Sequence, residues 1–246
     1  ALVETDSIYL GNDPSATTDT AEYNIAIGAT ALGAITTGDN NVAVGYDALD
    51  VNTTASKNTA LGSKALGHNT TGNDNVASGY KSLYENTTGL QNTASGSYSL
   101  NQNTTGNYNT ASGMNALRYN TTGTYNTGFG KDALYFSTGS YNSALGGSVL
   151  YKNTTGSYNT ASGHEALYTN TEGAYNTASG RWALRYNTTG SNNVASGYLA
   201  LSSNTTGSNN TAIGYQADVA SDNLTNATAI GNGASVASSN TMQLGN

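Results

Sequence analysis

The sequence predicts an all-β fold, a parallel β-solenoid (β-roll) of about fourteen 17-residue coils. The first observation behind this prediction is a glycine that recurs with a 17-residue period along most of the chain. The second is a constant set of residues around that glycine, because identical positions at a fixed period indicate stacked structural repeats. The third is a composition with only 9% charged residues and one proline, which is unlike an ordinary globular or disordered chain.

This marker glycine defines position 0 of each repeat, with negative positions before it and positive positions after it. Successive markers keep this period, except for a step of 16 into Gly146 and a step of 14 into Gly245. The step of 16 reflects the loss of one residue in a turn at 136–139, and turns tolerate such losses better than strands. The markers are Gly11, Gly28, Gly45, Gly62, Gly79, Gly96, Gly113, Gly130, Gly146, Gly163, Gly180, Gly197, Gly214, Gly231 and Gly245.

The repeats divide the chain into three parts. Residues 1–22 form an N-terminal segment with a partial first repeat, and 23–217 carry the 17-residue repeats. Residues 218–246 carry C-terminal repeats of a 14-residue type, which we expect to continue into a further domain.

Each repeat has the length of one coil with two short strands and two turns. Thr-Ala-Ser-Gly, as at 160–163, predicts the first strand, and the following Ala-Leu pair, as at 166–167, predicts the second. Asn-Thr-Thr-Gly predicts a turn in which glycine adopts a positive φ and asparagine bonds to its own backbone. Strands ~4.8 Å apart predict a rod of roughly 65 Å.

The first strand of each repeat lacks charged residues, and this indicates self-association. Side chains alternate between faces, so −4, −2 and 0 share one face and −3 and −1 share the other. No charged residue occurs from −3 to 0 in any repeat, whereas a solvated strand face normally carries some. Two alanines and one leucine per coil also bury little apolar area at ~25 cal/mol per Å². We therefore expect a fibre-like homo-oligomer, a homotrimer with rotational symmetry, in which one strand face fills the coil interior and the other packs against identical chains.

Several stretches resemble the Asn/Ser-x-Ala-Ile-Gly-x-x-Ala head repeat of trimeric autotransporter adhesins. This resemblance covers roughly 8–245 and implies a left-handed parallel β-roll that forms a homotrimer. Similar Asn-Thr-x-x-Gly arrays also look like the shafts of phage tail fibres. The chain departs from the adhesin pattern in its period of 17 rather than 14 and in its serines at −1 from Ser78 to Ser196. The matching stretches are 24–31, 41–48, 58–65, 211–217 and 227–236.

Asparagine at −4 is the most constant polar residue of the repeat. We interpret this column as structural, with stacked amides that bond from coil to coil as in other stacked sheets. Its members are Asn24, Asn41, Asn58, Asn75, Asn92, Asn109, Asn126, Asn142, Asn159, Asn176, Asn193 and Asn210.

Tyrosine is the one conspicuous side chain, with 18 copies. A column at −5 offers large contact area to a glycan or protein, or its rings stack on each other to stabilise the turn or the seam between chains. A second, broken stripe of tyrosines follows the leucine, and the same two interpretations apply to it. The −5 column is Tyr108, Tyr125, Tyr141, Tyr158 and Tyr175, and the broken stripe is Tyr84, Tyr135, Tyr151 and Tyr168.

The Thr-Thr pairs of the predicted turns, from Thr36/Thr37 to Thr205/Thr206, raise the hypothesis of an ice-binding face. Adjacent strand residues point in opposite directions, so a turn role is favoured over a flat threonine array. Asn-Thr-Thr also matches the N-glycosylation sequon, a motif that matters only in a secretory pathway that uses it. Matching residues include Asn69, Asn86, Asn103, Asn120 and Asn153.

The sequence gives no support for an enzyme, a metal site or a cofactor. Cysteine is absent, and His68 and His164 occupy different repeat positions, so we expect no serine or carboxylate beside either. A net charge of −7 and scattered lysines and arginines argue against nucleic acid as a partner. No run of 18 apolar residues exists, so we expect no membrane insertion by this segment.

Together these patterns predict a structural segment of an extracellular trimeric fibre or adhesin that displays a binding surface for attachment to a cell or host. Expected partners are identical chains and the surface glycans or proteins of a host or neighbouring cell. The alternatives are the shaft of a phage or injection-system tail fibre on a virion or tail, a self-assembling extracellular filament subunit, and an ice-binding β-solenoid.

Overall fold

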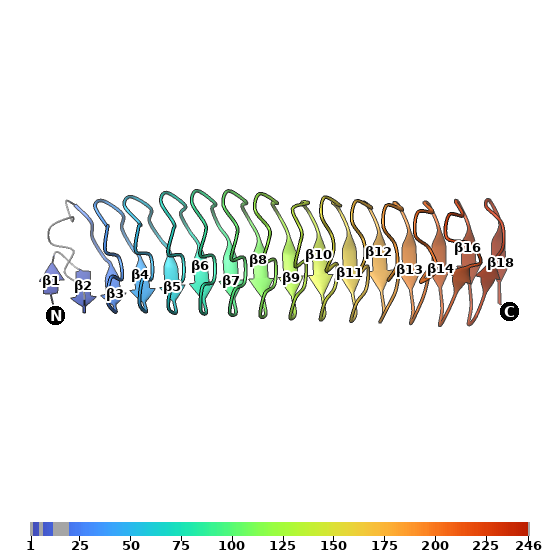
Figure 1. Cartoon of the computed structure of the whole chain (residues 1–246), viewed down its shortest axis with the longest axis horizontal. Helices are drawn as coiled ribbons and strands as arrows, with labels where there is room; N and C mark the ends of the chain where they lie inside the picture. Colours follow the sequence, from blue (N-terminus) through green and yellow to red (C-terminus); the bar gives the residue numbers. More distant parts are fainter. Residues whose placement is uncertain (1, 5–6, 12–19, 246) are drawn as a thin grey trace. The chain divides into compact units, whose positions relative to one another are not determined.

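One short strand recurs in every coil and sets the path of the chain (Figure 1). The computed structural model describes residues 2–4, 7–11 and 20–245. These residues form an all-β parallel β-solenoid of about 13 turns with a 17-residue repeat, and they include no helix. The chain divides into two compact units, Ala1–Tyr125 and Asn126–Asn246.

In the first unit the strands stack in sequence order, and each pairs with the next. β1 and β2 pair antiparallel, and the strands from β2 to β8 pair in parallel. The strands are β1 (Leu2–Glu4), β2 (Ser7–Leu10), β3 (Ile25–Ile27), β4 (Val42–Val44), β5 (Thr59–Leu61), β6 (Val76–Ser78), β7 (Thr93–Ser95) and β8 (Thr110–Ser112).

The second unit continues the same parallel order from β9 to β14, then β16 and β18, and it has a separate pair formed by β15 and β17. The strands are β9 (Thr127–Phe129), β10 (Ser143–Leu145), β11 (Thr160–Ser162), β12 (Thr177–Ser179), β13 (Val194–Ser196), β14 (Thr211–Ile213), β15 (Asp218–Val219), β16 (Thr228–Ile230), β17 (Ser235–Val236) and β18 (Met242–Leu244).

The pairing register follows the sequence repeat. Ala161 lies opposite Ala178, which is the same repeat position one coil later. The strands pair at equivalent repeat positions across the two shorter steps as well. Ser143 pairs with Thr127 across the step of 16, and Thr228 pairs with Met242 across the step of 14. Equivalent positions therefore stay in line within each unit even where the spacer between strands changes length.

The second strand predicted at the Ala-Leu pair is wrong for most coils. The backbone turns there, because the residues at +2 and +4 have left-handed φ values, for example 56° at Glu165 and 52° at Leu167. A left-handed conformation costs a residue with a side chain roughly 1–2 kcal/mol, and burying a leucine contributes about 1.5–3 kcal/mol, so the buried side chain offsets the strain. Among the described residues a second strand forms only as β15 and β17, where Asp218 and Ser235 replace the leucine and lack the left-handed φ.

The interior of a coil contains few side chains. Around β11 these are Ala161, Ala166 and Leu167, together with Asn159 and Asn170, and each is at most 2% exposed. The alanine side chains are small because neighbouring coils approach each other closely. The leucine side chain fills the space that remains in the coil. The core is thus part amide and part aliphatic, and its amide groups need hydrogen-bond partners.

Two glycine positions recur in most repeats for different reasons, although Ala55 and Leu224 occupy the second of them in their coils. The marker glycine has a left-handed φ, such as 131° at Gly180, where a Cβ would also lie 2.5 Å from the carbonyl oxygen of Gly197. The prediction of a positive φ at the glycine of Asn-Thr-Thr-Gly is wrong. At Gly156 the need is steric, because a Cβ would lie 2.5 Å from the carbonyl oxygen of Gly173 in the next coil.

Candidate functional site

The −4 asparagines lie inside the coils and bond to the backbone. Each is at most 1% exposed. Asn41 Oδ1 accepts a hydrogen bond from the backbone N–H of Asn58 at 3.0 Å, and its Nδ2 donates to the carbonyl of Ala55 at 2.9 Å. The same arrangement recurs along each unit, with Asn142, Asn159 and Asn176 as a run in the second. The column is therefore inaccessible to a ligand and satisfies the backbone of the coil.

A second buried asparagine column lies at +7, in the segment that the sequence assigned to a turn. Asn69 Nδ2 donates to Asn52 Oδ1 of the preceding coil at 3.2 Å and to the carbonyl of Gly72 at 2.9 Å. The signal for this column was an Asn that recurs at +7 in most repeats, usually with Gly three residues later. The sequon asparagines named above belong to it and are 0% exposed: Asn69, Asn86, Asn103, Asn120 and Asn153.

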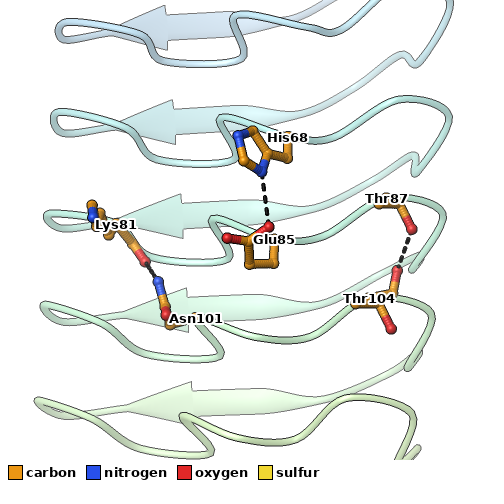
Figure 2. A network of polar contacts seen from close by, with 6 residues as sticks. All are labelled: His68, Lys81, Glu85, Thr87, Asn101 and Thr104. Atoms are coloured by element: carbon orange, nitrogen blue, oxygen red, sulfur yellow. Dashed lines mark hydrogen bonds and ion pairs between the residues drawn. The ribbon is translucent and has the colours of Figure 1, made fainter.

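The threonine pairs lie in the same turn. Thr70 Oγ1 donates to the carbonyl of Thr87 in the next coil at 2.9 Å, and Thr87 Oγ1 does the same to Thr104 at 3.0 Å (Figure 2). The second threonine of the pair, Thr71, is exposed. The hydroxyl groups of Thr70 and Thr87 thus link neighbouring coils.

The −5 tyrosines form two exposed stacks. In the first unit, the rings of Tyr108 and Tyr125 lie 4.7 Å apart with an interplanar angle of 12°. In the second, the rings of Tyr141, Tyr158 and Tyr175 lie 4.9 Å apart at angles of 2° and 1°. About half of each side chain is exposed. The stacks expose ring edges and hydroxyl groups at the turn that precedes the strand.

The backbone at −5 does not favour tyrosine. Every residue of the column has a left-handed φ, for example 61° at Tyr158 and 58° at Tyr175. Asparagine tolerates this conformation best among residues with a side chain, and Asn192 and Asn209 occupy the same position with φ values of 59° and 60°. The run of tyrosines is therefore not explained by the conformation of the turn.

The second tyrosine stripe is half-buried and partly stacked. Tyr135, Tyr151 and Tyr168 stack at 5.0 and 5.2 Å in the second unit. In the first unit Tyr84 packs against the ring of His68, with centroids 4.2 Å apart.

The strand face at −3 and −1 is exposed in the single chain. The middle residue of each three-residue strand from β3 to β14 is buried, while its two neighbours are exposed or half-exposed. Apolar side chains on this face include Ile27 and Leu61 in the first unit and Phe129, Leu145 and Ile213 in the second, each at least 40% exposed. All lysines and arginines instead lie at −5, +1, +2, +5 or +6.

One prediction about the histidines is wrong. His68 lies beside a carboxylate, because Glu85 occupies the same +6 position one coil later and its Oε2 is 2.8 Å from His68 Nδ1 (Figure 2). Figure 2 also shows Asn101 Nδ2 donating to the backbone carbonyl of Lys81, at 2.9 Å. The side chains of His68 and Glu85 are 44% and 43% exposed, so the pair is a surface contact at the end of a coil.

Two carboxyl groups titrate abnormally. Burial raises the pKa of Asp50, and the nearby Asp47 carboxylate adds to this, while His68 opposes it. Burial also raises the pKa of Asp218, although hydrogen bonds from the Val219 and Ser203 N–H groups and the Ser202 hydroxyl oppose the change. The two groups lie in different units.

Sequence reasoning missed a cluster of arginine and aromatic side chains around Trp182. The Arg181 guanidinium carbon lies 3.9 Å from the Trp182 ring centroid, and that of Arg185 lies 5.1 Å away. Glu165 Oε2 accepts from Trp182 Nε1 at 3.0 Å and is 2.7 Å from Arg185 Nη2. The signal was the position of the single tryptophan between two of the eight basic residues.

Within the part of the chain that the structure describes, no group of three or more histidines and carboxylates is placed to hold a metal ion. The described residues also contain no helix of the length and hydrophobicity needed to cross a bilayer. Comparison of the sequence with models of known protein families gives no match, and comparison with curated proteins gives none.

Proposed function

We propose that this chain is a structural segment of an extracellular fibre, in which three identical chains associate side by side through the −3/−1 strand face. The fibre serves attachment to a cell or host, as an adhesin head or as the shaft of a phage or injection-system tail fibre. Its role is to display binding surface rather than to catalyse a reaction.

The observation that carries this proposal is the contrast between two surfaces of the coil. The −3/−1 face is exposed but carries no charge in any repeat, and it presents apolar side chains such as Leu145, which is 58% exposed. The lysines and arginines lie in the turns and bends between strands. Soluble monomers rarely leave contiguous apolar surface in water, so an exposed uncharged strand face is typical of an interface.

A second copy of the chain is the partner that fits this face. Because the face lacks charge throughout, it offers no electrostatic complement to a charged partner, while a face of threonine, serine and β-branched residues packs against its own equivalent. Closed rotational symmetry gives every copy the same contacts. The resemblance to trimeric adhesin heads supports three chains and a left-handed coil.

The −5 tyrosine stacks support the display role. They lie at the turn before the strand, outside the −3/−1 face, and therefore remain available when chains associate through that face. Tyrosine offers a large rigid surface and a hydroxyl at little cost in conformational entropy, which suits contact with a glycan or protein.

The oligomeric state tests the proposal. Leu145→Lys places a charge on the −3/−1 face, and Met114→Lys places one on an exposed apolar side chain at +1. By sedimentation equilibrium we expect the unsubstituted chain and Met114→Lys to be trimers, and Leu145→Lys to be a folded monomer. A monomeric unsubstituted chain, or equal behaviour of the two variants, would contradict the proposal.

A further inference from the structure

The Trp182 cluster orders one arginine without neutralising it. Glu165 Oε2 is shared by Trp182 Nε1 and Arg185 Nη2, so this carboxylate is used by the indole and by Arg185. Arg181 lies over the indole ring 3.9 Å from its centroid, is exposed, and lies in no salt bridge found among the described residues. A stacked guanidinium retains its in-plane N–H donors for a planar anion.

The surroundings of Arg181 favour an anion. Residues 133–217 contain two acidic side chains, Glu165 and Glu172, in a chain whose net charge is −7. Glu165 is paired with Arg185. His164 lies at +1 of the preceding coil, the position that Arg181 occupies in its own coil. The carboxylates that repel anions elsewhere on the chain are thus sparse around this coil.

An aromatic surface extends from Arg181 along the same column. The next two residues at +1 are Tyr198 and Tyr215, whose rings stack with centroids 5.3 Å apart and an interplanar angle of 20°. Trp182 connects to them, since its ring centroid lies 5.6 Å from that of Tyr198. Tyr215 is 53% exposed. The Arg181 guanidinium therefore lies at the end of a row of aromatic rings with one ring per coil.

We propose that Arg181, Tyr198 and Tyr215 form a binding site for an acidic saccharide, an oligosaccharide that carries carboxylates. Arg181 binds a sugar carboxylate through paired N–H donors, and the exposed edges of the tyrosine rings contact apolar C–H groups of neighbouring sugar units while their hydroxyls bond to sugar hydroxyls. Trp182 and the Glu165–Arg185 pair hold Arg181 in place. The site rests on the proposed display function and names a ligand class for it.

A saccharide fits this surface better than an acidic peptide. The stacked rings expose edges and hydroxyl groups, and the row contains no large aliphatic side chain for a peptide to pack against. Regular spacing of one ring per coil suits a polymer of repeated rings.

The single tryptophan makes the test direct, because its fluorescence reports this coil alone. The chain is titrated with a hexamer of galacturonic acid, with the neutral galactose hexamer, and with hexaglutamate. We expect the acidic sugar to change Trp182 emission and to bind at least tenfold tighter than the other two, with an affinity that falls as salt rises. Equal binding of hexaglutamate would overturn the saccharide assignment, and equal binding of the neutral sugar would overturn the role of Arg181.

Two variants and a matched control complete the experiment. Arg181→Gln and Tyr215→Ser should each weaken binding of the acidic hexamer at least tenfold by calorimetry, while Lys131→Gln, at the same +1 position, should leave it unchanged. Unchanged affinity in Arg181→Gln would overturn the site. Sedimentation of the same samples separates the two proposals, since a trimer that does not bind contradicts only this site, and a monomer that binds contradicts only the fibre.

Discussion

The side-chain oxygen of Asn159 accepts a hydrogen bond from the backbone N–H of Asn176, one coil later, at 2.9 Å. The Nδ2 of Asn159 donates to the carbonyl of Gly173 at 2.8 Å. Both partners are buried backbone groups. One side chain thus ties a strand to the following turn, in a coil whose aliphatic core is small.

Replacing Asn159 by alanine should therefore be costly. The variant leaves the buried Asn176 N–H unpaired, whereas the Gly173 carbonyl still accepts from Asn170 Nδ2 at 2.9 Å, so we expect a loss of about 1–3 kcal/mol. Asn159→Ser should lose less, because Ser7 shows that a serine hydroxyl at −4 accepts from the next N–H, that of Asn24, at 2.9 Å. Urea unfolding midpoints of the three proteins measure this order. Equal losses in the two variants would show that the accepting oxygen contributes little.

Gly180→Ala should disrupt its coil, whereas Gly147→Ala should not. Gly180 combines a φ of 131° with a Cβ position 2.5 Å from a backbone oxygen, and we expect a loss of at least about 2 kcal/mol. At Gly147 a Cβ would meet only the His164 ring, at 3.5 Å, with no left-handed φ. There we expect a change within about 1 kcal/mol, in the stabilising direction. Thermal unfolding of both variants makes the comparison, and similar melting temperatures would count against the close approach of marker glycines.

The pH dependence of stability should include a contribution from Asp218. Burial raises its pKa above the ordinary value of 3.8, so the folded state binds this proton more tightly than the unfolded state. The resulting stabilisation is complete below pH 3.8 and is lost as the pH rises through the folded pKa. Asp218→Asn should therefore melt higher than the unsubstituted chain at pH 7, with a difference that shrinks toward pH 3.8. Melting curves across this range, with Glu172→Gln as an exposed control, measure it, and a difference independent of pH would rule out the titration.

Tyr175→Asn should leave the stability of the chain nearly unchanged. The variant loses a ring stack with Tyr158 worth about 0.5–1.5 kcal/mol and relieves a left-handed conformation that costs tyrosine roughly 1–2 kcal/mol. These effects offset each other, so we expect a net change within about 0.5 kcal/mol by urea unfolding. A loss of about 2 kcal/mol or more would assign the tyrosine stack a structural role.

The repeat made the fold predictable. The 17-residue spacing of the marker glycine predicted a parallel solenoid, and the pairing of Ala161 with Ala178 follows that spacing. The alternation of faces at the strand followed from side-chain geometry, and Ala144 is buried between two exposed neighbours as that alternation requires.

The path of the chain between strands was harder to predict. Nothing in an Ala-Leu pair signals a left-handed φ at Leu167, since leucine avoids that region and adopts it only because the coil buries its side chain. The contact between His68 and Glu85 was readable from their shared +6 position but was overlooked. The Trp182 cluster joins +1, +2 and +5 side chains of adjacent coils, and their proximity depends on a turn conformation that the repeat does not reveal.

The burial of the +7 asparagines has a consequence for producing this protein in eukaryotic cells. Asn69, Asn86, Asn103, Asn120 and Asn153 carry the acceptor sequence, yet each amide lies inside its coil. An oligosaccharide attached to any of them during translocation would occupy the place of a neighbouring coil and prevent the chain from closing. A eukaryotic secretory host would therefore be expected to retain and degrade this protein, while a host without that modification would release it folded.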